Sequence, residues 1–197
     1  MKIGILGGTF DPVHAGHIAL ARAAKEQFGL DKVLFVPAFI PPHKTAHRDL
    51  TPAPYRYRMI ELAIRCEPDF ELSDVELNRP EVSYTVDTIR AIKKRYRAAE
   101  LYLIVGADTL QEIPRWHESK AICDMAQILA APRPGAPRHS PFKDRVHWIE
   151  MPEQEVSASE IRETFRKGKA LQGEKLPEGV ENYISRLKLY QKDSLCP

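Results

Sequence analysis

Lys-Ile-Gly-Ile-Leu-Gly-Gly-Thr-Phe-Asp-Pro-Val-His-Ala-Gly-His, residues 2–17, is the stretch that decides the fold of this chain. A short apolar run (residues 3–6) ends at Gly7-Gly8, and an apolar pattern of helical spacing starts near Gly16. A buried strand that passes through glycines into the first turn of a helix is typical of α/β proteins, in which strands and helices alternate. The stretch therefore predicts the first strand–loop–helix unit of a parallel sheet.

The junction between this strand and helix has the composition of a phosphate site. Backbone N–H groups at a helix N-terminus favour an anion, and glycine allows close approach because it has no Cβ. Two histidines three residues apart add imidazole donors at the same place. A glycine pair is also ordinary turn chemistry and single histidines are often structural, so the functional interpretation depends on their joint occurrence. The candidate residues of this stretch are Gly7, Gly8, Thr9, Phe10, His14 and His17.

Composition and spacing argue against several classes of protein. The chain has 197 residues, 43% of them hydrophobic and 28% charged, as expected of one globular α/β domain over residues 1–197. Its net charge of +2 gives no strong attraction for nucleic acid or an anionic membrane. We see no signal peptide and no apolar stretch that could span a membrane. The glycines fail the G-x-G-x-x-G pattern, which argues against a nicotinamide-dependent dehydrogenase.

Three widely separated cysteines complete this picture. Cys66, Cys123 and Cys196 lack C-x-x-C spacing, which argues against a disulfide framework and against a zinc site. We therefore expect a cytoplasmic protein with reduced thiols and no protein metal site.

The rest of the chain alternates strand and helix patterns, which predicts a Rossmann-like parallel sheet with helices on both faces. The expected strands are residues 2–6, 32–37, 70–72, 101–105, 126–131 and 146–149. The expected helices are residues 16–28 with Gly29 as the stop, 56–66, 86–96, 109–113, 119–124, one opening at Ser157, and 177–189 with Pro177 in its first turn. In such a sheet, ligands gather at the carboxyl ends of the strands, so the loops there should converge on one crevice.

Two loops that follow predicted strands contain groups suited to bind an anion: one has a lysine, and the other opens a helix. Pro41-Pro42-His43-Lys44 places a lysine on a stiffened loop, where it suits a phosphate; an ordinary exposed lysine is the alternative. Ser83-Tyr84-Thr85-Val86-Asp87-Thr88 opens a helix whose free N–H groups suit a small anionic group. Simple capping by Ser83 or Thr85 is the competing explanation.

Three further motifs lie downstream. Gly106-Ala107-Asp108 follows a strand and suits a planar base with its ribose, although Asp108 could instead cap a helix. Trp116 lies in a loop, where an indole can stack on a heteroaromatic ring or belong to the core. Ser157-Ala158-Ser159-Glu160-Ile161-Arg162 is a capping box with an arginine one turn in, a second helix start of phosphate-binding type; Arg162 as a surface residue is the alternative.

Together these segments resemble the cytidylyltransferase-like nucleotidyltransferases with the [HT]-x-Gly-His signature, and among them the bacterial-type nicotinate-mononucleotide adenylyltransferases. The resemblance covers nearly the whole chain, from Gly7 to Arg162. It implies transfer of AMP from ATP, with Mg²⁺, to nicotinate mononucleotide. It also implies the roles of the site residues. His14, His17, Lys44 and Arg162 would serve phosphates, Gly106 and Asp108 the adenosine, Trp116 the pyridine ring, and the backbone around Thr85 and His117 the pyridine carboxylate. Tyr84, beside Thr85, is a further candidate for substrate binding.

One departure and three alternatives stand beside this expectation. Family members commonly carry Ser-Ser-Thr where this chain has Ser157-Ala158-Ser159, so one hydroxyl for phosphate is missing at Ala158. Another adenylyltransferase, such as one acting on phosphopantetheine, shares the first motif. A nucleotide sensor without turnover could use the same loops. Leu and Tyr residues near the C-terminus suit either a core or a homo-oligomer interface.

Overall fold

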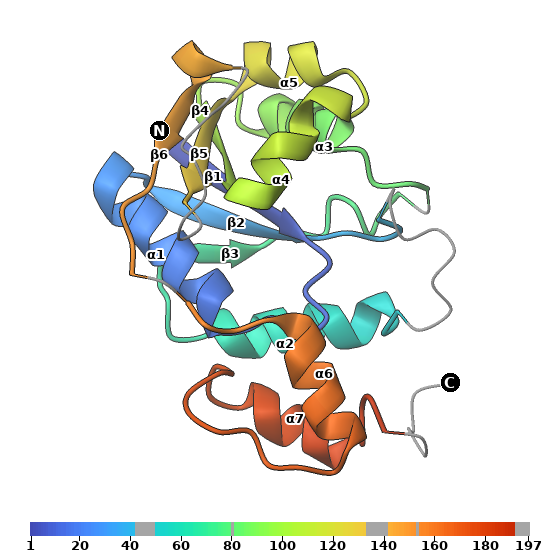
Figure 1. Ribbon diagram of the computed structural model, residues 1–197. Coiled ribbons are helices and arrows are strands. Elements are labelled where there is room, and N and C mark those ends of the chain that lie inside the picture. Colours follow the sequence, from blue (N-terminus) through green and yellow to red (C-terminus); the bar gives the residue numbers. More distant parts are fainter. Residues whose placement is uncertain (42–49, 80, 133–141, 153, 192–197) are drawn as a thin grey trace.

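The computed structural model describes residues 1–41, 50–79, 81–132, 142–152 and 154–191. Its centre is a six-stranded sheet of order β3-β2-β1-β4-β5-β6, in which all neighbouring strands are parallel (Figure 1). The strands are β1 (Lys2–Gly8), β2 (Lys32–Pro37), β3 (Phe70–Leu72), β4 (Glu100–Gly106), β5 (Gln127–Ala131) and β6 (Val146–Trp148). The helices are α1 (Ala15–Phe28), α2 (Ala53–Ile64), α3 (Thr85–Arg95), α4 (Ala107–Glu112), α5 (Ser119–Met125), α6 (Ala158–Arg166) and α7 (Val180–Arg186), with 3₁₀ turns η2 (Ile113–Arg115) and η3 (Lys143–Arg145).

Both faces of the sheet are covered, as the continuous apolar strands require. Along β2, Val33 and Phe35 belong to one core cluster, while Leu34 and Val36 belong to the other. The first cluster includes residues of α1, α2, α6 and α7, and the second includes residues of α3 and α5. Figure 1 shows these two groups of helices on opposite sides of the strands. The expected fold class, a Rossmann-like parallel sheet with helices on both faces, is confirmed.

Several predicted boundaries are exact and others shift. Strands 32–37 and 70–72 are as predicted, and Gly29 ends α1 in the left-handed conformation at φ 61°. β1 and β4 run on to Gly8 and Gly106, because these glycines stay in register with Pro37 and Ala131 of the neighbouring strands.

The prediction that Pro177 lies in the first turn of the last helix is wrong. Pro177 closes a separate turn in which its carbonyl accepts from the N–H of Val180. Gly179 at φ 84° then breaks the helical conformation, so α7 starts at Val180. The expected apolar residues near the C-terminus are core: Leu189 is buried, and Tyr190 packs against the same cluster.

Two further observations concern the cysteines and membranes. Cys66 and Cys123 are free thiols, the first exposed and the second buried, and Cys196 lies outside the described residues. In the part of the chain that the structure describes, we find no helix with the length and hydropathy needed to cross a bilayer.

Candidate active site

The carboxyl ends of β1 and β4 open into a cavity of about 1090 Å³. The chain continues from β1 toward β2 on one side and from β4 toward β5 on the other. Loops after these two neighbouring strands therefore diverge and leave a crevice between them. The predicted site residues on the cavity wall are Gly7, Gly8, Thr9, His14, His17, Thr85, Gly106, Trp116 and Ser157.

Other predicted site residues lie off this wall. Phe10 is buried beneath it, Tyr84, Asp108 and His117 are exposed, Arg162 is half-buried, and Lys44 lies outside the described residues. The N-cap of α4 is Gly106, with Asp108 in the first turn, so the alternative that Asp108 caps this helix is wrong. α3 likewise starts after Tyr84 with no side-chain cap, so capping by Ser83 or Thr85 is wrong too.

The two histidines are held by the start of α1. His14 is the N-cap residue in an extended conformation, and its N–H donates to Nδ1 of His17 over 3.2 Å. A side chain at the third helical position that bonds back to the N-cap amide is one half of a capping box, and here an imidazole makes that bond. The two rings lie 3.7 Å apart between centroids, and Phe10 meets His17 edge-on at 5.0 Å.

Burial keeps both imidazoles neutral near pH 7. Desolvation lowers the pKa of His14 to about 4. It also lowers the pKa of His17 well below its usual value, and the neighbouring His14 adds to that shift. Because Nδ1 of His17 accepts a hydrogen bond, the proton of the neutral ring is assigned to Nε2. Nδ1 of His14 is buried without a hydrogen-bond partner among the described residues, which is unusual unless a ligand or water supplies one.

Gly16 makes room for this pair. A Cβ at Gly16 would lie 3.1 Å from Nδ1 of His14 and 3.1 Å from Cγ1 of Val156. These distances are tighter than ordinary contacts, so a side chain here would push the His14 ring or the segment before α6. The glycine between the histidines thus lets α1 start against Val156.

A buried arginine that the sequence analysis did not single out binds carbonyl groups of three loop segments. Arg56 is 1% exposed, and its guanidinium donates to the carbonyls of Thr51 and Thr9, each over 2.7 Å, and of Phe39 over 3.4 Å. Burial lowers its pKa, with Asp11 as the largest opposing influence. The signal was available, because Arg56 shares a helical face with the apolar Met59 and Ile60.

Asp11 connects the first motif to the C-terminal part of the chain. Its carboxylate accepts from the Tyr190 hydroxyl over 2.9 Å and from the Thr51 N–H over 3.3 Å. Its carbonyl accepts from Arg162 over 2.6 Å, and Arg162 also donates to Oγ of Ser159. Arg162 therefore binds protein groups on the β1–α1 loop, beside the histidine pair.

The helix start at Ser157 shows one half of the predicted capping box. Oγ of Ser157 accepts from the N–H of Glu160 over 3.2 Å, and both residues line the cavity. The first turn of α6 therefore lies at the β1 end of the cavity, where Val156 is close to Gly16 and Arg162 donates to the Asp11 carbonyl.

A carboxylate that the sequence analysis also missed lies beneath α3. Glu76 is buried on the cavity wall, and burial raises its pKa despite hydrogen bonds from Thr88 and Ser83. The Thr88 hydroxyl lies 2.6 Å from Oε1 of Glu76, and Arg79 donates to Thr88 over 3.1 Å. Ser83 accepts from the Phe39 N–H over 3.0 Å, so this cluster fixes the loop before α3 to the end of β2.

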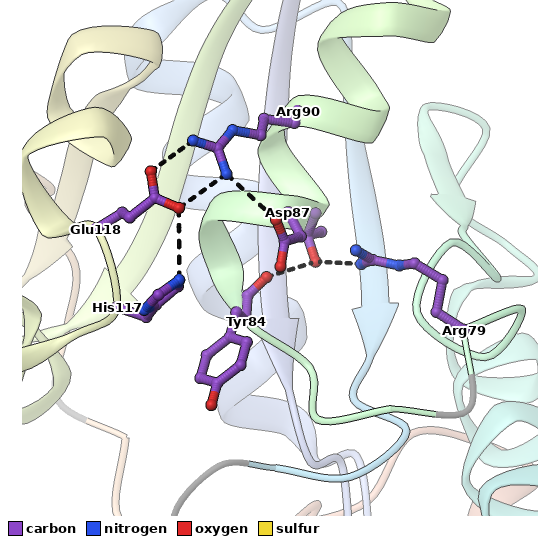
Figure 2. A network of polar contacts seen from close by, with 7 residues as sticks. Arg79, Tyr84, Asp87, Arg90, His117 and Glu118 are labelled. Carbon is purple, nitrogen blue, oxygen red and sulfur yellow. Dashed lines mark hydrogen bonds and ion pairs between the residues drawn. The ribbon is translucent and has the colours of Figure 1, made fainter.

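Trp116 lies on the cavity wall, and the neighbouring His117 lies off it. Trp116 packs against the second core cluster and also lines the cavity. The core interpretation therefore holds for part of the indole, and stacking on a substrate ring stays a prediction. Its indole N–H is buried without a partner among the described residues. The ring of the next residue, His117, packs against Tyr84 in a tilted arrangement, with centroids 4.8 Å apart and the planes inclined by 41°. Figure 2 shows His117 and Tyr84 facing each other between α3 and the segment before α5.

No group of three His, Cys, Asp or Glu side chains suited to hold a metal gathers within the described ranges. The cavity carboxylates missed by the sequence analysis besides Glu76 are Glu112 and Glu155, and a missed lysine is Lys175, whose carbonyl accepts from the Ala15 N–H. These positions lie in segments without motif character, so only the fold reveals them.

Comparisons with known proteins agree with this geometry. The cytidylyltransferase-like family model matches residues 5–164. A nicotinate-nucleotide adenylyltransferase of Bacillus subtilis is 39% identical over 190 residues, which covers 96% of this chain and 98% of the relative. A probable nicotinate-nucleotide adenylyltransferase of Exiguobacterium sibiricum is 40% identical and covers 96% of this chain and 99% of its own length.

A solved structure shares the fold at low identity. The Plasmodium falciparum nicotinic acid mononucleotide adenylyltransferase complexed with NaAD superposes with a TM-score of 0.80 at 20% identity, over 96% of this chain and 97% of that one. The family model and these relatives lead to one conclusion, with which the fold agrees. The chain belongs to the cytidylyltransferase-like family, among the nicotinate-nucleotide adenylyltransferases.

Proposed function

We propose that this enzyme joins nicotinate mononucleotide to ATP, giving deamido-NAD and pyrophosphate. The observation that carries the proposal is the wall of one cavity. It combines the glycine end of β1, two neutral imidazoles at a helix start, and an indole on the other side. Such a site can hold phosphates at one end and a flat ring at the other.

The chemistry needs an oriented nucleophile more than a base. An oxygen of the mononucleotide 5′-phosphate bonds to the α-phosphorus of ATP while the bond from that phosphorus to the bridging oxygen breaks, and pyrophosphate leaves. A phosphate with a second pKa near 6 is about nine-tenths ionised at neutral pH, so no proton has to be removed from it. Catalysis then comes from alignment and from donors placed where charge develops.

The chain's residues divide this work. Nε2–H of His17 and the ring of His14 supply neutral donors beside the reacting phosphorus, and Gly7, Gly8 and Thr9 let the phosphates approach the backbone. Lys44 and Arg162 supply positive charge. Gly106 and Asp108 serve the adenosine, Trp116 stacks on the pyridine ring, and the backbone at Thr85 and His117 receives its carboxylate.

The separated carboxylates on the cavity wall suit a Mg²⁺ ion that is bound mainly by the ATP phosphates, as this ion prefers. When bound, the ion would neutralise charge on the triphosphate. The net charge of +2 supports small anionic substrates as partners in place of nucleic acid. The free thiols of Cys66 and Cys123, the two cysteines that the structure describes, support a place in the cytoplasm.

The product identifies the reaction. We would supply ATP and Mg²⁺ with nicotinate mononucleotide, nicotinamide mononucleotide or phosphopantetheine in parallel, and measure both pyrophosphate and the adenylylated product by chromatography. We expect turnover to be fastest with nicotinate mononucleotide. Preference for phosphopantetheine would make the enzyme a different adenylyltransferase, and binding of ATP without any product would make it a sensor.

A further inference from the structure

A cross-link of charged side chains joins two segments that the proposed reaction uses. Arg90 of α3 and Glu118, the N-cap of α5, are 28 residues apart in the chain, and their side chains meet through two hydrogen bonds of 3.0 and 2.6 Å. The guanidinium also donates to Asp87, one turn earlier on α3, over 3.3 Å. Figure 2 shows Arg90 between the two carboxylates.

Each end of this cross-link lies next to a residue of the cavity wall. On the α3 side, Asp87 follows Thr85 by two residues, and Thr85 lines the cavity. On the other side, Glu118 follows Trp116 by two residues, and Trp116 lines the cavity as well. The Arg90–Glu118 pair therefore connects the two segments that the proposed function assigns to the pyridine ring and its carboxylate.

The backbone at Glu118 has an unusual conformation. Glu118 adopts φ 50° and ψ 43°, the left-handed conformation that costs a non-glycine residue free energy. That conformation turns the chain sharply between Trp116 and α5, where the Ser119 N–H donates to the Trp116 carbonyl. A bidentate guanidinium–carboxylate pair is a directional contact that can favour this turn.

A second contact crosses the gap between the Trp116–His117 segment and the start of α3. Nε2 of His117 lies 3.4 Å from Oε1 of Glu118, and the His117 ring packs on Tyr84. The Glu118 carboxylate thus touches groups on both sides of the gap (Figure 2). It holds the Trp116–His117 segment at a set position relative to the start of α3.

Stability alone does not explain the arrangement. Arg90 and Glu118 are 46% and 41% exposed in their side chains, and exposed ion pairs contribute little to the free energy of unfolding. A contact of this kind matters when it selects one arrangement of a loop, because small displacements of the groups that hold a substrate ring weaken its binding.

We propose that Arg90 and Glu118 are positioning residues that set the distance between the Trp116–His117 segment and the start of α3, and so determine how tightly the mononucleotide binds. The inference rests on the proposed function, because it assumes that these segments receive the pyridine ring. It assigns no direct contact with substrate to either residue.

The test is a double-mutant cycle with Arg90→Met, Glu118→Gln and the double variant. Each single variant should raise the KM for nicotinate mononucleotide by about three- to tenfold, which lies in the lower part of the range of coupling that contacting residues show. The KM for ATP and kcat should stay within about twofold of wild type, because the residues proposed to bind ATP and to stabilise the reacting phosphorus lie on other segments. The double variant should be no worse than either single one, since both remove the same contact.

The exposed Arg58–Glu61 pair on α2 provides a matched control, with side chains 52% and 51% exposed. Arg58→Met and Glu61→Gln should leave all kinetic constants unchanged. Unchanged KM in the Arg90 and Glu118 variants, or equal effects on ATP and the mononucleotide, would overturn the inference. Calorimetric Kd values for nicotinate mononucleotide compare the variants with wild type without any turnover. The proposed function is tested separately, because it fails if the wild-type enzyme forms no product.

Discussion

The lowered pKa of His14 makes the stability of the folded protein depend on pH in a calculable way. In the unfolded chain the imidazole pKa is near 6.5, and in the folded protein desolvation lowers it to about 4. The unfolded state therefore binds the proton first as the pH falls, so folding stability decreases from about pH 6.5 down to about pH 4. Above this window the ring is neutral in both states and contributes no pH dependence.

The size of the effect follows from the two pKa values. Between pH 7 and pH 5 the linkage relation gives a loss of about 2 kcal/mol, and water in the cavity reduces this to about 1–2 kcal/mol. His14→Asn removes this titration. Urea denaturation at the two pH values should therefore show a larger loss of unfolding free energy for wild type than for the variant, by about 1–2 kcal/mol.

His147 gives the control for this experiment, because it is exposed on β6, away from the cavity. His147→Asn should keep the pH dependence of wild type. If His14→Asn also keeps it, His14 titrates normally in the folded protein, and the argument that burial keeps this ring neutral fails.

Three substitutions test other parts of the site. Trp116→Ala should raise the KM for the mononucleotide about tenfold or more, since stacking on a ring is worth about 1–3 kcal/mol; an unchanged KM would show that the indole serves the core alone. Gly16→Ala should lower kcat about tenfold by displacing the His14 ring, whose Nδ1 lies 3.1 Å from the added Cβ, while circular dichroism stays as in wild type; full activity would show that the ring has room to move. Arg56→Met should lower the unfolding free energy by about 2–4 kcal/mol, because it leaves buried carbonyls unpaired, and a loss as small as that of Arg58→Met would show that water replaces the guanidinium.

Local sequence patterns were sufficient to predict the strands and most of the helices. Residues 32–37 and 70–72 are apolar runs bounded by turn residues, and a parallel strand buried on both faces needs no other signal. Gly29 ends α1 as predicted, because a left-handed residue at a helix end favours glycine. The start of the last helix was wrong because Pro177 suits an isolated turn as well as a first helical turn.

Contacts of the candidate site between residues close in the sequence could be predicted. Contacts between residues far apart in the sequence could not. His14 and His17 interact within one helical turn, so their spacing was sufficient. Arg56 binds carbonyls up to 47 residues away, and no local pattern shows which loops will meet. Arg162 was a predicted site residue, but its contact with the Asp11 carbonyl was not predicted, because the two residues are 151 positions apart.

The central claim is that neutral imidazole donors at the start of α1 stabilise charge at the phosphorus under attack. Its most direct test is kcat for deamido-NAD formation by His17→Ala under saturating ATP and nicotinate mononucleotide. Loss of one such donor predicts a fall of about a hundredfold or more in kcat, with the fold preserved. Turnover within a few-fold of wild type would contradict the account, because the best-positioned donor of the cavity would then take no part in the reaction.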